Sequence, residues 1–385
     1  MREDWDIRLF KEVFDLQMGK TPDRKNFSLF EGDNMWVSIK DLDGKYISSS
    51  KECISDEAAK NIKLVKRGTV IMSFKLTVGK TAIAGKDLYT NEAIMAFNLR
   101  NGYDIDASFL YYYLKNYRWD GSNKAVMGIT LNKATISKHK IAIPPKPTQL
   151  SIVSELDKLN ELIQIKKEQL KDYDALAQSI FYEMFGDPVV NEKGWEVMSL
   201  ADVCHSITDG DHMPPPKADS GIPFLTISNI NKETRSLDFS DTFFVPQSYY
   251  VALKESRKPM ENDLLYTVTG SYGIPVVVDG KNSFCFQRHI ALLRPNVDKV
   301  LTLYLCYWCL CPSIKQVADK VATGIAQKTV SLTSLRKFSI ILPPLPLQHS
   351  FAHKIEQIER QKAAVQRTIK DLETLLAARM QYWFE

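Results

Sequence analysis

The chain has 385 residues, 44% of them hydrophobic, and its 50 basic and 46 acidic residues leave a formal net charge of +4. This length and apolar content suffice for two separate cores, so we expect a soluble, cytoplasmic globular protein without a signal peptide or membrane span. The weak net charge excludes a uniformly basic nucleic-acid binder, so any affinity for DNA must come from local patches or from partner chains.

Residues 1–143 form the first predicted domain. Short β-branched and aromatic runs, such as residues 36–39 and 68–72, alternate with turns that contain Gly, Asn or Asp, and residues 109–114 predict a helix. This mixture is typical of an α+β domain. It contains 23 basic and 18 acidic residues, whereas residues 187–342 contain 16 of each.

Residues 144–186 predict a long helix. From position 152 to 184, apolar residues recur in a strict four-three alternation that only Lys166 breaks, as in a coiled-coil seam. Pro147 suits the first helical turn and Gly186 the end of the helix. About 39 residues at ~1.5 Å each give a rod of roughly 58 Å, which cannot bury its apolar stripe alone. The seam residues expected here are Ile152, Leu156, Leu159, Ile163 and Leu170.

The second half of the chain repeats this plan, with a domain at residues 187–342 and a second long helix at 343–385. The Pro-Pro-x-x-x-Gln sequence at residues 144–149 recurs 199 positions later at 343–348. Residues 224–227 and 304–308 likewise match residues 36–39 and the helix at 109–114. In the second helix Arg379 breaks the seam, where its neighbour Met380 can replace it; the expected seam residues are Phe351, Ile355, Ile358, Val365, Ile369, Leu372 and Leu376.

This duplication predicts an α+β fold in which two similar domains are joined by two long helices that pack as an antiparallel coiled coil, with pseudo-twofold symmetry. A single apolar-striped helix would be explained equally well by a core helix or a homodimeric coil. Two helices of equal length, separated by a whole domain, favour the intramolecular pair.

The six cysteines are too few and too irregularly spaced for a disulfide framework in a chain of this length. Cys306, Cys309 and Cys311 resemble part of a metal site, but they lie in an almost wholly apolar segment without a second ligand pair. We therefore expect them to pack in the core as reduced thiols, and we expect no metal site.

With these motifs, the chain resembles the specificity subunit of type I restriction-modification systems over nearly its full length. The resemblance depends on the two Pro-Pro-x-x-x-Gln junctions, on the Gly-Lys-Thr-Pro sequence at residues 19–22, and on two similar loops at residues 71–80 and 265–273. At both junctions the chain departs from the family pattern, because Thr148 and Leu347 precede Gln where Glu is expected. In addition, the Gly-x-x-Gln element at residues 324–327 has only Gly-Ile-Thr-Leu, residues 128–131, as its counterpart.

The resemblance implies a non-catalytic subunit of a DNA methylation complex in anti-phage defence. Each domain would read one half of a split double-stranded DNA sequence, and the helices would act as a ruler and dock two methyltransferase subunits, which restriction and translocation subunits join. S-adenosylmethionine, ATP and Mg are then expected in the partner subunits, with no cofactor in this chain.

The motifs of catalysis are absent from the sequence, consistent with this interpretation. The chain has no Pro-Pro-aromatic motif with a leading Asp or Asn to hold a flipped base; the nearest sequence, Met-Pro-Pro-Pro at residues 213–216, lacks both the polar and the aromatic residue. A Gly-x-x-x-x-Gly-Lys-Ser/Thr phosphate loop is also missing. Neighbouring Cys204 and His205, and the separate His289, give no sign of a catalytic Cys-His pair.

DNA recognition requires cations for phosphates and amides, hydroxyls or forked donors for base edges. Candidates in the first domain are Lys20, Thr21, Arg24, Lys25, Ser38, Lys40, Lys75, Thr77 and Lys80. Candidates in the second are Thr208, Asp209, His212, Asn229, Thr269, Ser271, Tyr272, Arg288 and Lys328. The first set can also be read as an ordinary solvated loop, and Asp209 and Asp211 as turn residues instead of acceptors for a cytosine amino group.

Two other functions compete with the leading one. A coiled-coil adaptor would bind only proteins, and a specificity protein of a related anti-phage system would work without the usual restriction subunit. Polar and basic loops at equivalent positions of both halves favour DNA as the target.

Overall fold

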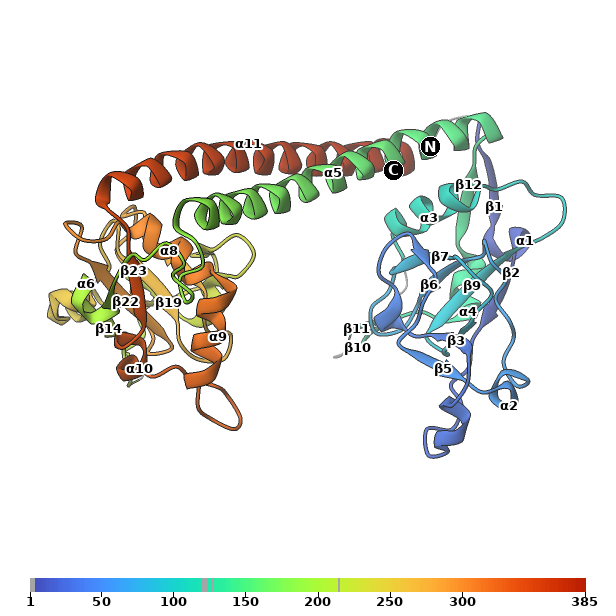
Figure 1. Ribbon diagram of the computed structural model, residues 1–385. Helices are drawn as coiled ribbons and strands as arrows, with labels where there is room; N and C mark the ends of the chain where they lie inside the picture. Colours follow the sequence, from blue (N-terminus) through green and yellow to red (C-terminus); the bar gives the residue numbers. More distant parts are fainter. Residues whose placement is uncertain (1–3, 120–122, 126–127, 214) are drawn as a thin grey trace. The chain divides into compact units, whose positions relative to one another are not determined.

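The computed structural model describes residues 4–119, 123–125, 128–213 and 215–385, with only the backbone described for 123–125 and 128–130. Contacts divide the chain into two compact units (Figure 1). Unit 1 contains residues 1–167 and 367–385, and unit 2 contains residues 168–366. Each unit therefore holds one globular domain and part of both long helices.

Unit 1 is built around a five-stranded sheet with the strand order β2-β9-β6-β7-β4. A second sheet, β5-β3-β8, pairs its central strand antiparallel with β5 and parallel with β8. Two further strand pairs, β1-β12 and β10-β11, complete the described sheets of this unit. The strands are β1 (Asp6–Leu9), β2 (Phe14–Met18), β3 (Asn34–Val37), β4 (Tyr46–Ile47), β5 (Glu52–Ile54), β6 (Val70–Ser73), β7 (Thr81–Ala84), β8 (Tyr89–Thr90), β9 (Ile94–Leu99), β10 (Asn123–Ala125), β11 (Gly128–Thr130) and β12 (Lys140–Ile143).

One face of the five-stranded sheet is covered by α3 (Ala107–Asn116), which lies between the sheet and the first long helix (Figure 1). Phe109 of α3 packs in one apolar cluster with Ile152, Leu156 and Met380 of the long helices. The helix is therefore buried on both sides, which explains its run of aromatic residues. Shorter helices are α1 (Phe10–Val13), α2 (Asp56–Ala59) and α4 (Lys133–Lys138), with 3-10 turns at Phe27–Phe30 and Ile39–Asp41.

Unit 2 repeats this topology. Its four-stranded sheet, β14-β22-β19-β20, corresponds to β2-β9-β6-β7, and β18-β15-β21 again combines an antiparallel and a parallel pair. The pairs β13-β23 and β16-β17 complete the set. The strands are β13 (Glu196–Ser199), β14 (Cys204–Asp209), β15 (Ile222–Leu225), β16 (Ile230–Asn231), β17 (Ser236–Leu237), β18 (Phe243–Val245), β19 (Leu264–Thr267), β20 (Pro275–Val277), β21 (Cys285–Phe286), β22 (Ile290–Pro295) and β23 (Ser339–Leu342).

The helices of unit 2 follow the same pattern, because α8 (Thr302–Leu310) takes the place that α3 has in unit 1. Phe181, Tyr304 and Phe351 belong to one core cluster, with 5.6 Å between the ring centroids of Phe181 and each of the other two. The predicted pair of similar α+β domains is confirmed. The other helices are α6 (Leu200–Val203), α7 (Gln247–Ala252), α9 (Pro312–Val321) and α10 (Leu332–Arg336), with 3-10 turns at Ile227–Asn229 and Glu255–Arg257.

The strands predicted at residues 36–39 and 224–227 have the expected length but begin and end two residues earlier, at Asn34–Val37 and Ile222–Leu225. β3 ends at Val37 and β15 at Leu225, and each is followed by a 3-10 turn. The reason is a capping interaction that the apolar pattern does not reveal. Ser38 and Thr226 begin these turns, and each bonds to the side chain three residues later.

The two long helices are α5 (Lys146–Phe185) and α11 (Leu345–Phe384). Pro147 and Pro346 lie in their first turns, where a missing backbone N–H costs nothing. Gly186 ends α5 with φ of 79°, a conformation that glycine adopts without a steric penalty.

The glutamine of each Pro-Pro-x-x-x-Gln junction is buried and ties the start of a long helix to the loop before α3 or α8. Gln149 donates to the carbonyls of Pro144 and Asp104 (3.0 and 3.1 Å) and accepts from the backbone N–H of Asp106 (2.8 Å). Gln348 makes the equivalent three contacts in unit 2, with Pro343, Lys299 and Leu301. The junction motif is thus a structural clamp that needs both the donor and the acceptor of an amide.

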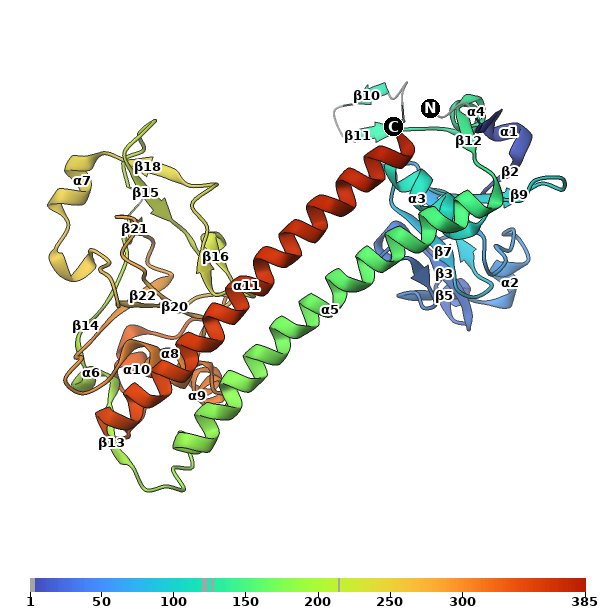
Figure 2. The same ribbon diagram turned by 90° about the horizontal axis from the view of Figure 1, so that it is seen from above.

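Within each unit, α5 and α11 lie side by side and run antiparallel (Figure 2). In unit 1, Arg379 and Trp383 of α11 both bond to Glu155 of α5, and Lys167 lies 2.9 Å from Glu373. In unit 2, residues 181 and 185 of α5 contact Phe351. Along these contacts the residue numbers rise in α5 while they fall in α11. The two helices are therefore antiparallel.

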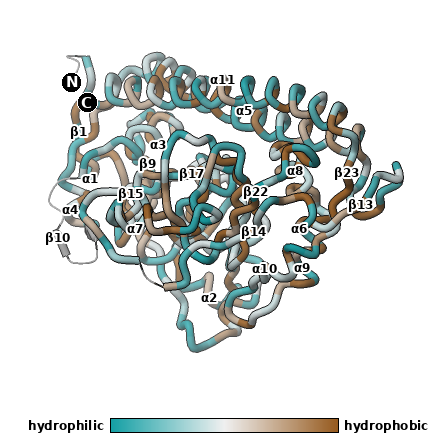
Figure 3. The backbone as a smooth tube through the Cα atoms, turned by 90° about the vertical axis from the view of Figure 1, so that its left-hand side faces the viewer, coloured by the Kyte–Doolittle hydropathy of each residue, from teal (hydrophilic) through white to brown (hydrophobic). Residues whose placement is uncertain are grey.

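The seam residues of these helices are mostly buried, and Figure 3 shows hydrophobic and hydrophilic residues alternating along both helices. Leu170, Leu372 and Leu376 are only half-buried. Toward the end of α5 the buried positions change from the predicted Ile180 and Met184 to Phe181 and Phe185, because the helix there packs against α8 as well as α11. Nine seam residues are buried: Ile152, Leu156, Leu159, Ile163, Phe351, Ile355, Ile358, Val365 and Ile369.

Across the described residues, no helix is both long and apolar enough to span a bilayer.

The thiols of Cys306, Cys309 and Cys311 are buried in the core of unit 2, as the apolar segment predicts. Burial raises the pKa of Cys306 and Cys311 to about 12 and that of Cys309 well above its usual range. At pH 8 almost none of these groups is in the reactive thiolate form.

We therefore expect a thiol reagent at pH 8 to label Cys53 first, because this half-buried residue lines a surface hollow. Cys306, Cys309 and Cys311 should react only after unfolding. Peptide mass spectrometry after timed labelling measures this order. Fast labelling of the three in the native protein would contradict the packing of α8.

Candidate nucleic-acid interface

The loop between β6 and β7 in unit 1 is held by its own hydrogen bonds. The Ser73 hydroxyl donates to the carbonyl of Thr77 and accepts from the backbone N–H of Lys80 (3.1 Å). Gly79 closes the turn by donating to the Ser73 carbonyl (2.9 Å) with φ of 91°. Because the backbone is fixed in this way, the exposed side chains of Thr77 and Lys80 project from a defined loop.

The loop between β19 and β20 in unit 2 is built in the same way. The Thr267 hydroxyl donates to the carbonyl of Ser271 (2.8 Å) and accepts from the N–H of Ile274 (3.0 Å). Gly273, with φ of 95°, donates to the Thr267 carbonyl (2.9 Å). The two units therefore present equivalent loops with different side chains.

The basic segment after β2 is partly neutralised by carboxylates of unit 1. Arg24 forms two hydrogen bonds with Glu52 (2.5 and 3.0 Å), which lower the pKa of that carboxyl group. The guanidinium also lies over Phe30 and Trp36, 4.4 and 4.9 Å from the ring centroids. Arg24 thus has a structural role that its place in a basic run did not reveal.

Glu92 is a partner of Thr21 in the segment after β2 and lies within the electrostatic influence of Lys75 in the β6–β7 loop. Thr21 donates a hydrogen bond to Glu92. Although burial acts to raise the pKa of Glu92, this bond and the positive charges of Lys75 and Arg24 hold it below its usual range. Lys20, Lys25 and Lys40 are exposed. Phosphate oxygens are natural partners for such exposed cations.

Ser38 and Asn229 were both predicted to contact DNA, but the structure gives them a role in the fold. Ser38 caps a 3-10 turn and donates to Asp41 (2.7 Å). Asn229 is 5% exposed; its oxygen accepts from Thr226, and its nitrogen donates to the carbonyls of Asp238 and Asp241. The amide of Asn229 is therefore fully used within unit 2 and has no group left for a base edge.

The turn after β14 carries two carboxylates, and His212 and Arg257 lie beside them. His212 is 2.7 Å from Asp209, and Arg257 lies 3.6 Å from Asp209 and 3.8 Å from Asp211. Burial and the nearby Asp211 raise the pKa of Tyr249. The two carboxylates thus have His212 and Arg257 as partners within unit 2, and a contact of Asp209 with a cytosine amino group stays a prediction.

Two other candidates lie beside this turn. The Thr208 hydroxyl donates to the Ser256 carbonyl (2.8 Å), so its proton is used within the fold. Arg288 is exposed, and its backbone N–H donates to the carbonyl of Asp211 (3.1 Å). Arg288 therefore keeps its guanidinium at the surface next to this turn.

The second group of candidates in unit 2 surrounds the β19–β20 loop. Thr269 is buried and accepts from Thr329 (3.2 Å), while Tyr272 donates to Asp319 (2.7 Å) beneath Lys315. Ser271 accepts from Lys232 (2.6 Å). The exposed Lys328 is joined to this loop because its carbonyl accepts from Gly270 (2.9 Å).

Three residues on these surfaces were not predicted from the sequence. Lys232 and Arg257 come from loops far from the motifs, and no local pattern indicates them. Ile325 is fully exposed in the short turn that Thr323 and Thr329 close by two backbone hydrogen bonds. The Gly-x-x-Gln element at residues 324–327 was noted in the sequence, but the exposure of the apolar side chain within it was not predicted. Its counterpart at residues 128–130 falls where side chains are not described.

These surfaces, on two copies of one α+β domain that are each followed by a 40-residue helix, define a duplicated, helix-linked recognition protein. Comparison with protein families identifies the group. The Type I restriction modification DNA specificity domain matches twice, over residues 2–172 and 192–374. The chain belongs to this family.

Two relatives from Methanocaldococcus jannaschii extend the match over most of the chain. The Type I restriction enzyme MjaIX specificity subunit is 24% identical to this chain. The alignment covers 92% of this chain and 86% of that relative. The putative type I restriction enzyme MjaX specificity subunit is 21% identical, with 97% of this chain and 93% of the relative covered.

Solved structures share the fold. A chain from a structure concerned with assembly and conformational transition of the type I R-M system aligns with 100% of this chain and 98% of its own length, with a TM-score of 0.64 and 20% identity. The type I restriction-modification S subunit from M. genitalium aligns with 99% of this chain and 96% of its own length, with a TM-score of 0.50 and 13% identity.

Proposed function

We propose that this chain is the DNA-specificity subunit of a type I restriction-modification complex and that each unit reads one half of a bipartite target. The duplication carries the proposal: two family matches coincide with two repeats of one topology, and equivalent loops of the repeats bear different side chains. A shared scaffold with different loops suits two unlike half-sites.

The proposal includes the partners. The chain would dock two methyltransferase subunits through α5 and α11, and restriction and translocation subunits would join that core. It would catalyse nothing itself; S-adenosylmethionine, ATP and Mg would be bound by the partners. Absence of the methyltransferase and phosphate-loop motifs from the sequence supports this division of labour.

The experiment is methylome sequencing of cells with and without this chain, together with capture of its partners. A split methylated motif that disappears on deletion supports the proposal. An unchanged methylome with captured protein partners would instead indicate a protein adaptor.

We expect the isolated chain to bind DNA weakly and the assembled methyltransferase complex to bind it tightly. The reason is electrostatic: the net charge of the chain is only +4, and Arg24 and Arg257 are already paired with carboxylates, so the chain alone attracts phosphates weakly. Gel-shift titration at one fixed salt concentration compares the two forms. Equal affinities would refute the expectation.

A further inference from the structure

A buried lysine interrupts the apolar seam in unit 2. Lys362 of α11 occupies a seam position between Ile358 and Val365 and is only 6% exposed. Its ammonium group donates to Asp174 of α5 (2.8 Å) and to Glu359 one turn away (3.0 Å). A lysine is rarely buried unless it is paired, so this contact determines which part of α5 can lie opposite it.

Asp174 is shared between the helix pair and the globular domain. Its Oδ1 atom also accepts from Arg235 (2.7 Å), at the turn between β16 and β17. Although burial acts to raise the pKa of Asp174, the bonds from Lys362 and Arg235 hold it below its usual range. Arg235 has a φ of 51°, which is an unfavourable backbone conformation for a residue other than glycine. In this conformation its guanidinium group bonds to Asp174 of α5.

Glu359 connects the same cluster to α8. It accepts from the hydroxyl of the buried Tyr307 (3.1 Å), and burial together with this carboxylate raises the tyrosine pKa. Five residues from four elements, Tyr307, Glu359, Lys362, Asp174 and Arg235, therefore form one chain of contacts with two positive and two negative charges.

An apolar seam alone specifies the helix register poorly, because leucine and isoleucine recur at each heptad and pack similarly after a slip. The cluster removes this ambiguity. A slip of one heptad would place Phe181 or Lys167 opposite Lys362 in place of Asp174. Either arrangement removes the carboxylate on α5 and leaves the buried ammonium group with Glu359 of its own helix as its partner, which is unfavourable because Lys362 is only 6% exposed.

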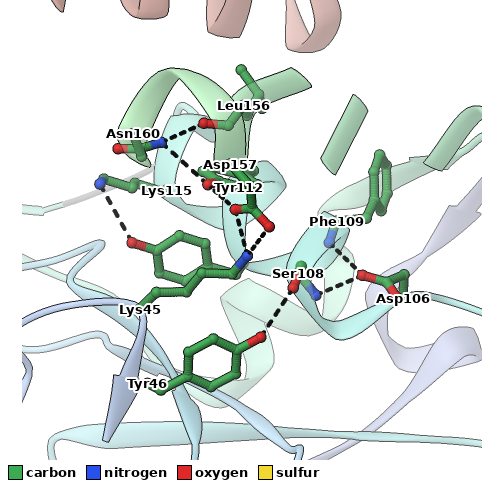
Figure 4. A network of polar contacts seen from close by, with 11 residues as sticks. Lys45, Tyr46, Asp106, Ser108, Phe109, Tyr112, Lys115, Leu156, Asp157 and Asn160 are labelled. Carbon is green, nitrogen blue, oxygen red and sulfur yellow. Dashed lines mark hydrogen bonds and ion pairs between the residues drawn. The ribbon is translucent and has the colours of Figure 1, made fainter. Parts of the chain in front are cut away.

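Unit 1 has a related contact between domain and helix but no buried cation in its seam (Figure 4). Lys45 precedes β4 as Arg235 precedes β17, and it bonds to Asp157 of α5 (2.6 Å), which also accepts from Tyr112 of α3. The seam residue that corresponds to Lys362 is Ile163, 199 positions earlier. The interhelical ion pairs of unit 1, Glu155 with Arg379 and Lys167 with Glu373, lie at partly exposed side chains, so breaking them leaves no buried charge of the kind that Lys362 would become.

We propose that the Asp174–Lys362 pair is the register-determining contact of the long helices, and that it thereby fixes the number of unread base pairs between the two half-sites. Asp174 and Lys362 are positioning residues, and they touch no base. The second part of the proposal rests on the function proposed above.

The test is the double variant Asp174→Asn with Lys362→Leu, assembled with the methyltransferase subunits. Asparagine still accepts from Arg235, and leucine suits the seam, so we expect a folded complex. Both half-sites should stay unchanged, but a second population of methylated targets should appear whose spacer differs by about three base pairs, the equivalent of one heptad of ~10 Å. Methylome sequencing measures this.

The matched control is Lys167→Met with Glu373→Gln, which removes an exposed interhelical pair of similar length (2.9 Å) and should leave a single spacer. If the double variant loses its thermal transition, Lys362→Met alone provides a second variant with an unbranched side chain and the same expected result. A single wild-type spacer in a folded variant would overturn the proposal. Absence of any split motif in the unaltered complex would instead refute the proposed function.

Disulfide trapping measures the register without reference to methylation. With Cys53 and Cys204 replaced by serine, the pair Lys167→Cys and Glu373→Cys reports the observed register, and Lys167→Cys with Gln366→Cys reports a slip of one heptad. We expect only the first pair to cross-link in the parent chain and both to cross-link with Asp174→Asn and Lys362→Leu. Absence of the second cross-link would also overturn the proposal.

Discussion

Exchange of residues 1–143 for the first domain of another member of the family is expected to change one half of the methylated target and to leave the other half unaltered. The cores explain this independence: the apolar clusters of residues 5–142 in unit 1 share no residue with those of unit 2. Among the described residues, the loops of unit 1 thus pack on a core separate from the core on which the loops of unit 2 pack.

The structure indicates which contacts the exchanged domain must retain. Gln149 of α5 bonds to the backbone at residues 104 and 106, and Asp157 bonds to Lys45 and Tyr112. A donor that keeps Lys45 and Tyr112 should fold on the existing helix. Methylome sequencing of the hybrid complex reads both half-sites, and the reciprocal exchange of residues 187–342 is the control. A change in both halves after either exchange would contradict the independence of the two domains.

The duplication and the helices are predictable from the sequence because both depend on periodicity. The four-three alternation determines the apolar face of α5 over several turns, and the repeated Pro-Pro-x-x-x-Gln sequence locates where each long helix begins. The change to Phe181 and Phe185 is not predictable from the heptad, because it depends on α8, which lies more than a hundred residues away.

The candidate interface was predictable only at the level of loops. Fixed loops at residues 73–80 and 267–274 follow from Ser or Thr and Gly at set spacings, which are local features. The role of each side chain depends on partners distant in sequence: Arg24 meets Glu52, and Asp209 meets Arg257. The hydrogen bonds from the Asn229 side chain to the carbonyls of Asp238 and Asp241 likewise depend on residues brought together by the fold. Composition indicates that a loop is polar, but the fold decides which polar groups remain available.

Insertion of one heptad into each long helix is expected to lengthen the unread spacer by about three base pairs, since seven residues add ~10 Å of helix. The structure supplies the insertion points. The contact boundary falls between residues 167 and 168 in α5 and between residues 366 and 367 in α11. Because the helices are antiparallel, equal insertions at these two points leave the contacts inside each unit intact, including Glu155 with Arg379 and Asp174 with Lys362.

Insertion into α5 alone is the decisive control, because it offsets one helix against the other. Either the Glu155–Arg379 contact or the Asp174–Lys362 contact must then break, and loss of the second leaves the buried Lys362 without its partner on α5. We therefore expect the single insertion to lower the thermal midpoint and abolish methylation. The double insertion should keep both half-sites and move them apart, as methylome sequencing would show. An unchanged spacer in a folded, active double-insertion complex would refute the role of α5 and α11 as the ruler.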